Sequence, residues 1–282
     1  MSTLFGEPKI WHLPSLLLLL VCLSQARLAL ADPPAYDGKP GTTAGQTCVN
    51  PKDNALMVWV PAGDFLMGSA ETDARAMPDE VPQHTVKLDG YWIYQKDVTV
   101  AQYKAYCAAT DEAMPIDAPP WGWKDTHPMV NVNWKQAHAY AKWAGAHLPS
   151  EAQWEKAARG TDGRIYPWGN TWDNDKCNNA ANGPEKTMPV GSFPEGASPY
   201  GCLDMGGNVW QWCEDWYGGD YYNNAPATNP KGPEDGQWRV FRGGGWRNVA
   251  ASSFRCARRG YFDPGYTTNY LGVRCVVSPP AQ

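Results

Sequence analysis

The sequence Arg242-Gly-Gly-Gly-Trp246 lies between Gly207-Asn-Val-Trp-Gln-Trp212 and Leu271-Gly-Val-Arg274, and these three stretches decide the fold. They belong to a region, from Thr161 to the C-terminus, in which helical periodicity is absent and short apolar pieces alternate with Gly, Pro and Asn. A long region with little repetitive structure is usually either disordered or functional. Fourteen of the fifteen Trp residues lie after residue 31, which argues against disorder. We therefore expect an ordered, loop-rich region packed by aromatic side chains.

Before this region, three helices begin with the same capping pattern. A Thr, Asn or Ser is followed three residues later by Gln, so that each side chain can bond a free backbone N–H of the other residue. Gly145 and Gly160 fit the left-handed cap that ends many helices. The predicted helices start at Thr99-Val-Ala-Gln102, Asn133-Trp-Lys-Gln136 and Ser150-Glu-Ala-Gln153, and they end near Ala109, Gly145 and Gly160.

Strands are expected still earlier in the chain. A strand in Ala55-Leu-Met-Val-Trp-Val60 is broken by Pro61-Ala-Gly63 and returns as a hairpin through Phe65-Leu-Met67. His84–Leu88 and Tyr91–Tyr94 alternate well enough to be two further strands around Asp89-Gly90, a strong turn dipeptide.

The N-terminus has the pattern of an export signal. The apolar run Leu16–Leu23 is too short to cross a bilayer as a folded helix, and Ala29-Leu-Ala31 before Asp32 is a small-x-small cleavage pattern. The alternative interpretation is a lone N-terminal membrane anchor. We expect a periplasmic protein with three parts, namely a signal peptide at 1–31, a Pro/Gly/Thr-rich arm at 32–53 and one domain at 54–282.

The net charge and the cysteines indicate which partners and which kinds of site to expect. The net charge of −5 at pH 7 provides no basic face for nucleic acid or an anionic membrane, so neither is an expected partner. Seven cysteines remain after cleavage, and export favours disulfides among them. Because seven is odd, at least one thiol is unpaired or bridged to another chain. No CxxC is present, so a zinc ribbon or a thioredoxin motif is not supported.

Taken together, the ordered motifs resemble the formylglycine-generating-enzyme (sulfatase-modifying-factor) family over roughly residues 55–275. The resemblance implies an α+β fold, a variant of the C-type-lectin fold with small antiparallel sheets, a few helices and much ordered loop. The landmarks, in family order, are Met57–Phe65, Met67–Ser69, Val98–Tyr103, His127–Trp134, Leu148–Glu155, Tyr166–Asn170, Gly207–Trp212, Arg242–Trp246 and Leu271–Arg274.

One departure from the family bears directly on its chemistry. The family's oxidases carry two cysteines just after an Arg-Gly-Gly-Ser segment, and these thiolates bind copper(I), for which soft sulfur ligands are suited. Here the Ser position is Gly245 and the stretch from Gly245 to Arg255 contains no cysteine. The four histidines after residue 31 lack the short spacing of a metal site, so no redox cofactor is recognised.

The resemblance also implies a structural calcium ion. The first site would use the Asp204 side chain, the Gly207 and Val209 carbonyls and the Gln211 side chain, a mixed oxygen set that suits calcium. Gln211 stands where the family usually has Glu, so one negative charge is missing. A second site would involve Asn178 and the Asn179 carbonyl. The alternative is that both segments are simply hydrogen-bonded turns.

Family members with a Trp-x-Trp-Cys pattern imply a disulfide between Cys213 and Cys256, and Cys275 would then reach Cys107. The cysteine-pair-lacking, exported character is most similar to the periplasmic pyoverdine-maturation members of the family. That similarity implies an oxidoreductase that converts the dihydropyoverdine chromophore of a siderophore precursor to pyoverdine, together with other periplasmic maturation proteins as possible partners. Two alternatives stay open, namely a family oxidase with an unrecognised metal site and a non-enzymatic ligand- or protein-binding module.

Around the lost copper site, aromatic and guanidinium groups should converge on one concave face. Such a face suits a flat, partly anionic aromatic ligand through stacking and charge-assisted hydrogen bonds. Glu214 and Asp215 would supply a general base if their pKa values are shifted. The candidate catalytic residues beside them are Trp246, Arg247 and Asn248, and the candidate substrate-binding residues are Trp210, Arg255, Arg258, Arg259, Tyr261 and Tyr270.

Overall fold

The first sheet is built around two strands that are buried along nearly their whole length. In the computed structural model, which describes residues 1–2 and 32–280, β2 (Leu56–Val60) pairs antiparallel with β5 (Tyr91–Tyr94). The edge strands β1 (Thr47–Val49) and β10 (Val276–Val277) complete the sheet in the order β1-β2-β5-β10. The C-terminal end of the chain is thereby hydrogen-bonded into the sheet formed by its N-terminal strands.

The second sheet is a hairpin of β3 (Gly63–Met67) and β4 (His84–Leu88). The expected strands are therefore present, but the pairing expected for them is wrong. β3 does not return along β2, and Asp89-Gly90 links two sheets instead of closing a hairpin. Trp59 supplies a reason for the glycine, because a Cβ atom at Gly90 would lie 2.4 Å from the Trp59 ring.

The third sheet positions the residues around the Gly-rich segment. Its order is β8-β7-β6-β9, in which β6 pairs antiparallel with β7 and parallel with the short β9. The register of β6 against β7 shifts between Trp212 and Trp216, which marks a bulge. The strands are β6 (Trp210–Trp216), β7 (Arg239–Arg242), β8 (Gly260–Phe262) and β9 (Leu271–Gly272).

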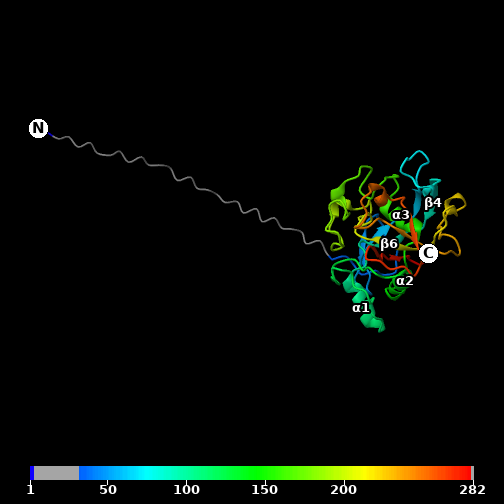
Figure 1. Ribbon diagram of the computed structural model, residues 1–282, viewed down its shortest axis with the longest axis horizontal. Coiled ribbons are helices and arrows are strands. Elements are labelled where there is room, and N and C mark those ends of the chain that lie inside the picture. The colour runs from blue at the N-terminus through cyan, green and yellow to red at the C-terminus, as the bar shows by residue number, and fades with distance from the viewer. Residues whose placement is uncertain (3–31, 281–282) are drawn as a thin grey trace. The chain divides into compact units, whose positions relative to one another are not determined.

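All three predicted helices are confirmed, each with a complete capping box. They are α1 (Val100–Thr110), α2 (Trp134–Trp143) and α3 (Glu151–Arg159), and α3 lies against β3, β4, β6 and β7 (Figure 1). After α3, the described chain has only 3-10 turns between its strands, as the missing helical periodicity indicates. The α+β architecture with small sheets and long ordered loops is the expected one, although β6 and β9 run parallel.

The N-terminal arm is part of this fold. Besides β1, it contributes the Lys39 carbonyl, which accepts from Trp92 Nε1 at 2.9 Å, and Gly45 N, which donates to the Trp59 carbonyl at 3.0 Å. The predicted cleavage pattern and the apolar run before it lie outside the described residues. Among the residues that are described, no helix is long and apolar enough to cross a membrane.

Candidate functional site

Asn248 fixes the start of β6 to the loop that follows β7. Its Oδ1 accepts from Trp210 Nε1 at 3.0 Å and from Gly245 N at 2.9 Å. The backbone N–H of Trp210 donates to the Tyr270 carbonyl at 2.8 Å, so the segment before β9 joins the same point. One amide oxygen thus holds two chain segments in place, and Trp210 is almost fully buried beneath them.

Trp246 lies half-buried beside this anchor and belongs to a group of rings with one cation. Its backbone N–H donates to the Asn208 carbonyl and its indole N–H to the Asn269 carbonyl, at 2.8 and 2.9 Å. Trp121 packs edge-on against it at 5.5 Å between ring centroids. The exposed Arg247 guanidinium lies 5.9 Å from the Trp246 ring and 5.2 Å from the Tyr270 ring. We call Trp121, Trp246, Arg247, Tyr266 and Tyr270 the aromatic cluster.

Tyr266 closes the cluster through its hydroxyl, which lies 3.0 Å from the Tyr270 hydroxyl. This hydrogen bond, together with burial, raises the pKa of Tyr266, whereas the nearby positive charge of Arg247 lowers it. The Tyr266 hydroxyl therefore stays protonated at neutral pH and acts as a hydrogen-bond donor or acceptor, not as a base, beside the guanidinium.

The Gly-rich segment allows the backbone to pass close to these rings. Gly243 and Gly244 have φ of +108° and +74°, a region that L side chains rarely adopt. At Gly245 a Cβ atom would lie 3.1 Å from the Tyr270 carbonyl oxygen and 3.2 Å from Trp210 Cδ1. The absence of a side chain at Gly245 therefore matches the close packing of Trp210 and Tyr270.

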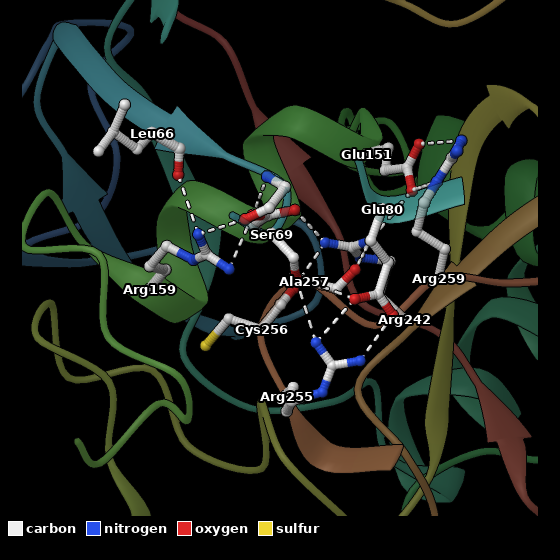
Figure 2. A network of polar contacts seen from close by, with 12 residues as sticks. Leu66, Ser69, Glu80, Glu151, Arg159, Arg242, Arg255, Cys256, Ala257 and Arg259 are labelled. Carbon is white, nitrogen blue, oxygen red and sulfur yellow. Dashed lines mark hydrogen bonds and ion pairs between the residues drawn. The ribbon is translucent and has the colours of Figure 1, made fainter. Parts of the chain in front are cut away.

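The expected arginines do not join this face. Arg255 makes a bidentate ion pair with Glu80, at 2.7 Å for both hydrogen bonds, and Arg259 pairs with Glu151 at 2.8 and 3.0 Å (Figure 2). Arg258, half-buried, lies 3.7 Å from Glu80. A buried guanidinium needs a partner of opposite charge, and each of these three arginines pairs with a glutamate. These three residues are structural in this fold, not part of the aromatic cluster.

Tyr261 is also placed elsewhere. It lies on the edge strand β8, where it stacks on Tyr217 at 3.8 Å between centroids and lies 5.2 Å from Trp238. It is partly exposed, and no described contact links it to Trp246. The predicted single face is therefore divided, with Trp210, Trp246, Arg247, Asn248 and Tyr270 together and the other residues apart.

Comparisons with known proteins identify the family of the domain that carries these residues. The Sulfatase-modifying factor enzyme 1-like domain matches residues 43–279. The chain belongs to this family. It is 33% identical over 309 residues to the formylglycine-generating enzyme of Streptomyces coelicolor, covering 88% of this chain and 96% of that protein. It is also similar to the serine/threonine-protein kinase pkn1 of Chlamydia caviae, at 35% identity, but spans only 37% of that protein.

A solved structure with the same fold is that of PvdO from Pseudomonas aeruginosa. The similarity has a TM-score of 0.75 at 27% identity and covers 84% of this chain and 99% of that one. The family includes enzymes, among them the formylglycine-generating enzyme of Streptomyces coelicolor, and nearly the whole of PvdO aligns with part of this chain.

The cysteines of the described residues all lie in the protein interior. Each of the seven in the described residues is buried and free, so the expected Cys213–Cys256 and Cys107–Cys275 bridges are not formed in the structure. Cys213 Sγ lies 4.0 Å from the Gln211 carbonyl of its own strand, whereas the Cys256 backbone is held by Ile165 and Arg242. Burial raises the pKa of Cys256 to about 12, so its thiol is protonated at neutral pH.

Neither expected base lies at the aromatic cluster. Asp215 is buried, its Oδ2 accepts from the Glu151 backbone N–H at 2.8 Å, and burial raises its pKa to about 8. Glu214 Oε2 lies 3.2 Å from His138 Nδ1. Glu214 follows Trp210 by four positions on β6, about 13 Å along a strand, so it lies too far along β6 to act beside that ring.

The first calcium site of the family does not fit the residues found here. Gln211 Oε1 accepts from Trp154 Nε1 at 2.7 Å and from Arg274 Nε at 2.8 Å, so it is already bonded and faces a cation. Gln211 Nε2 donates to the Asp204 carbonyl, and the Asp204 carboxylate accepts from Gly191 N at 2.6 Å. The segment is held by these hydrogen bonds as a turn.

The second site fits better. Asn178 Oδ1 is buried without a hydrogen-bond partner, and a Cβ atom added at Gly183 would lie 2.3 Å from it and 2.5 Å from the Asn179 carbonyl. Two uncharged oxygens therefore lie close together beside one glycine. Amide and carbonyl oxygens of this kind are ligands that calcium takes. If calcium is bound, Asn178 and Asn179 are the residues that would hold it, and it would fix the loop that also packs on Asn208.

Trp121, Tyr266 and Asn208 were missed by reasoning from the sequence. Trp121 lies in Pro119-Pro-Trp-Gly-Trp123, outside any periodic segment, and only tertiary contact brings it to Trp246. Tyr266 is four residues before Tyr270, in a stretch without secondary structure in which that spacing carries no signal.

Proposed function

We propose that this protein is an oxidoreductase that completes a siderophore chromophore by converting dihydropyoverdine to pyoverdine. The proposal is supported by family membership, by the similarity to PvdO, and by one structural observation, the aromatic cluster with its exposed guanidinium. The similarity to PvdO is what implies this substrate.

The cluster has the chemistry to recognise a flat ring that carries acidic hydroxyls. Trp246 and Tyr270 are half-buried, so part of each ring is available for stacking. Arg247 lies over both rings without a carboxylate partner among the described residues, and its donors are free for a bidentate contact with two adjacent oxygens. A dihydroxyquinoline-type ring presents both features.

Arg247 also gives the site a way to promote oxidation. A guanidinium near a catechol favours the catecholate and so lowers the pKa of the hydroxyl. The electron-rich catecholate loses electrons more readily than the neutral catechol. The substrate gives up two electrons and two protons as one single bond of the ring becomes double. Dioxygen accepts the two electrons and the two protons and becomes hydrogen peroxide. Water accepts the catechol proton when the catecholate forms and returns a proton to that oxygen after the oxidation, since Glu214 and Asp215 lie elsewhere.

We further propose that the reaction takes place in the periplasm, from the signal-like N-terminus. The partner in this account is the small-molecule siderophore precursor, and other periplasmic maturation proteins would supply and receive it. Neither nucleic acid nor a membrane surface is needed.

The test is aerobic incubation of the purified protein with dihydropyoverdine, followed by chromophore absorbance, fluorescence and hydrogen peroxide release. We expect protein-dependent conversion with about one peroxide per chromophore. The matched variant is Arg247→Gln, which keeps a polar side chain and removes the charge. No acceleration over the buffer control, in samples both with and without added metal ions, would overturn the proposal.

One observation favours a second candidate, a binding module without turnover. The aromatic cluster contains no carboxylate or imidazole that could move a proton, and a ligand-binding face needs none. In that case dihydropyoverdine and pyoverdine would bind with similar affinity, and the incubation would leave the chromophore unchanged.

A further inference from the structure

A second feature of the molecule is a pocket walled by arginines. It has a volume of about 440 Å³ and lies between the loop after β3, the loop after α3 and the segment after Phe254. Four arginines line it and Asp73 is the one acidic residue in its lining. Its lining charged residues are Asp73, Arg75, Arg159, Arg164 and Arg255.

The inner wall of the pocket carries an excess of positive charge. Arg159 and Arg255 are nearly fully buried (Figure 2). They belong to two neighbouring sets of ion pairs in which, together, five guanidiniums share three carboxylates. Glu80 serves two of these guanidiniums, and Glu155 and Glu151 both bond Arg242. The ion pairs run Arg258–Glu80–Arg255 and Arg159–Glu155–Arg242–Glu151–Arg259.

This excess is not cancelled by hydrogen bonds. The Nε groups of Arg159, Arg242 and Arg255 are buried without a hydrogen-bond partner in the described structure. Arg159 Nη1 donates to the Leu66 and Gly68 carbonyls, at 3.1 and 2.8 Å, and its Nη2 lies 3.3 Å from Glu155 Oε1. In an interior of low dielectric constant, unbalanced charge acts over a longer range than in water. The wall behind the pocket is therefore electropositive.

The outer wall holds two arginines, each paired with a partly exposed aspartate. Arg75 Nε lies 2.8 Å from Asp73, and Arg164 Nη2 lies 2.6 Å from Asp162. In each pair the carboxylate is only two residues away in the sequence and the pair is partly exposed, so water screens both interactions. The Arg164 pair is bidentate, since Nε also donates to Asp162 Oδ1 at 3.0 Å, and it is the stronger of the two. A ligand oxyanion can replace or share these partners.

We propose that this pocket binds a small oxyanion, a phosphate or carboxylate group, between Arg75 and Arg164, with the charge of Arg159 and Arg255 behind it. Guanidiniums match both groups with two parallel hydrogen bonds. The volume suits a small molecule and not a bare halide. This site is separate from the aromatic cluster, since its lining shares no residue with it, and it does not depend on the oxidation proposed above.

The test uses the full chain and isothermal titration calorimetry with inorganic phosphate and, separately, citrate, against sodium chloride of equal ionic strength. We expect at least one of the two anions to bind, and the tighter one to identify a tetrahedral or a planar oxyanion as the ligand group. The variant Arg75→Gln/Arg164→Gln should bind at least about tenfold more weakly, because two charge-assisted contacts are lost.

The matched control is Lys39→Gln/Lys104→Gln, which removes the same net charge from two exposed one-to-one ion pairs. It should bind within about twofold of the wild type, as expected for charges outside the pocket. Thermal melts without added anion check that each variant is folded. Three results would overturn the proposal: no heat with either anion, binding by the arginine variant at wild-type strength, or equal weakening in both double variants.

Discussion

Glu80 is the residue whose replacement should reveal how much the buried charge network matters to stability. In the structure its two oxygens accept from Arg255 at 2.7 Å each, and Ser69 Oγ donates to it at 2.9 Å. Glu80→Gln keeps the size of the side chain but removes its charge and turns an amide N–H₂ toward a guanidinium. Breaking one partner of a buried ion pair costs about 3–5 kcal/mol, so the free energy of unfolding should fall by about that amount.

The assay is chemical denaturation at pH 7, with Glu195→Gln as the matched control. Glu195 also pairs with a cation, Lys176 at 3.0 Å, but its side chain is 80% exposed. An exposed pair contributes at most about 1 kcal/mol, so this variant should resemble the wild type. A loss of less than about 1 kcal/mol for Glu80→Gln, equal to that of the control, would refute the reasoning that this pair is buried and uncompensated.

Three further predictions concern single residues, namely Asn248, Asp215 and Asn178. Asn248→Ala should lose about 2 kcal/mol in denaturation, because Trp210 Nε1 and a backbone N–H lose their acceptor, whereas Asn248→Asp keeps it; equal losses in the two variants would contradict the anchor. The raised pKa of Asp215, about 8, means that its contribution to stability is complete below about pH 4 and is lost as the pH rises toward 8. Asp215→Asn should therefore flatten the fall in stability between pH 5 and 8, and an unchanged slope would exclude this carboxyl as its cause. Calcium chloride should raise the melting temperature of the wild type but not of Asn178→Ala, whose orphaned oxygen is gone; an equal rise in both would place any calcium elsewhere.

Local sequence patterns were enough to predict the helices and the positions of most strands. A capping box is made by residues three positions apart, so Thr99, Asn133 and Ser150 could be identified without knowledge of the tertiary fold. Strand pairing is a long-range property. The dipeptide Asp89-Gly90 has the composition of a hairpin turn, yet its glycine is matched by Trp59, a contact that no local pattern reveals.

The candidate site also has a part that the sequence could predict and a part that depends on long-range contacts. Trp246, Arg247 and Asn248 follow one another in the chain, and Trp210 and Tyr270 reach them through backbone pairing at the edge of β6. The arginines at 255, 258 and 259 were predicted to lie on the same face because the resemblance to the family places them around the lost copper site. Which way each guanidinium points depends on Glu80 and Glu151, which are more than a hundred residues away, and so could not be read from spacing.

The predicted calcium ligands show what a family resemblance cannot predict. The Gln211 position could be aligned with a family ligand, but its availability depends on Trp154 and Arg274, which occupy its oxygen. A resemblance to a family predicts which residues would bind the ion, but it does not show whether their oxygens already accept hydrogen bonds. Here the buried oxygen without a hydrogen-bond partner is Asn178 Oδ1.

The aromatic cluster as the oxidation site is the central claim, and initial rates of dihydropyoverdine oxidation in three variants test it most directly. Arg247→Gln and Trp246→Ala should each lower the rate at least about tenfold, while Glu214→Gln, changed on the same sheet but away from the cluster, should leave it unchanged. The opposite pattern, with full activity after the two cluster substitutions and loss of activity in Glu214→Gln, would contradict the account and place the chemistry at the far end of β6.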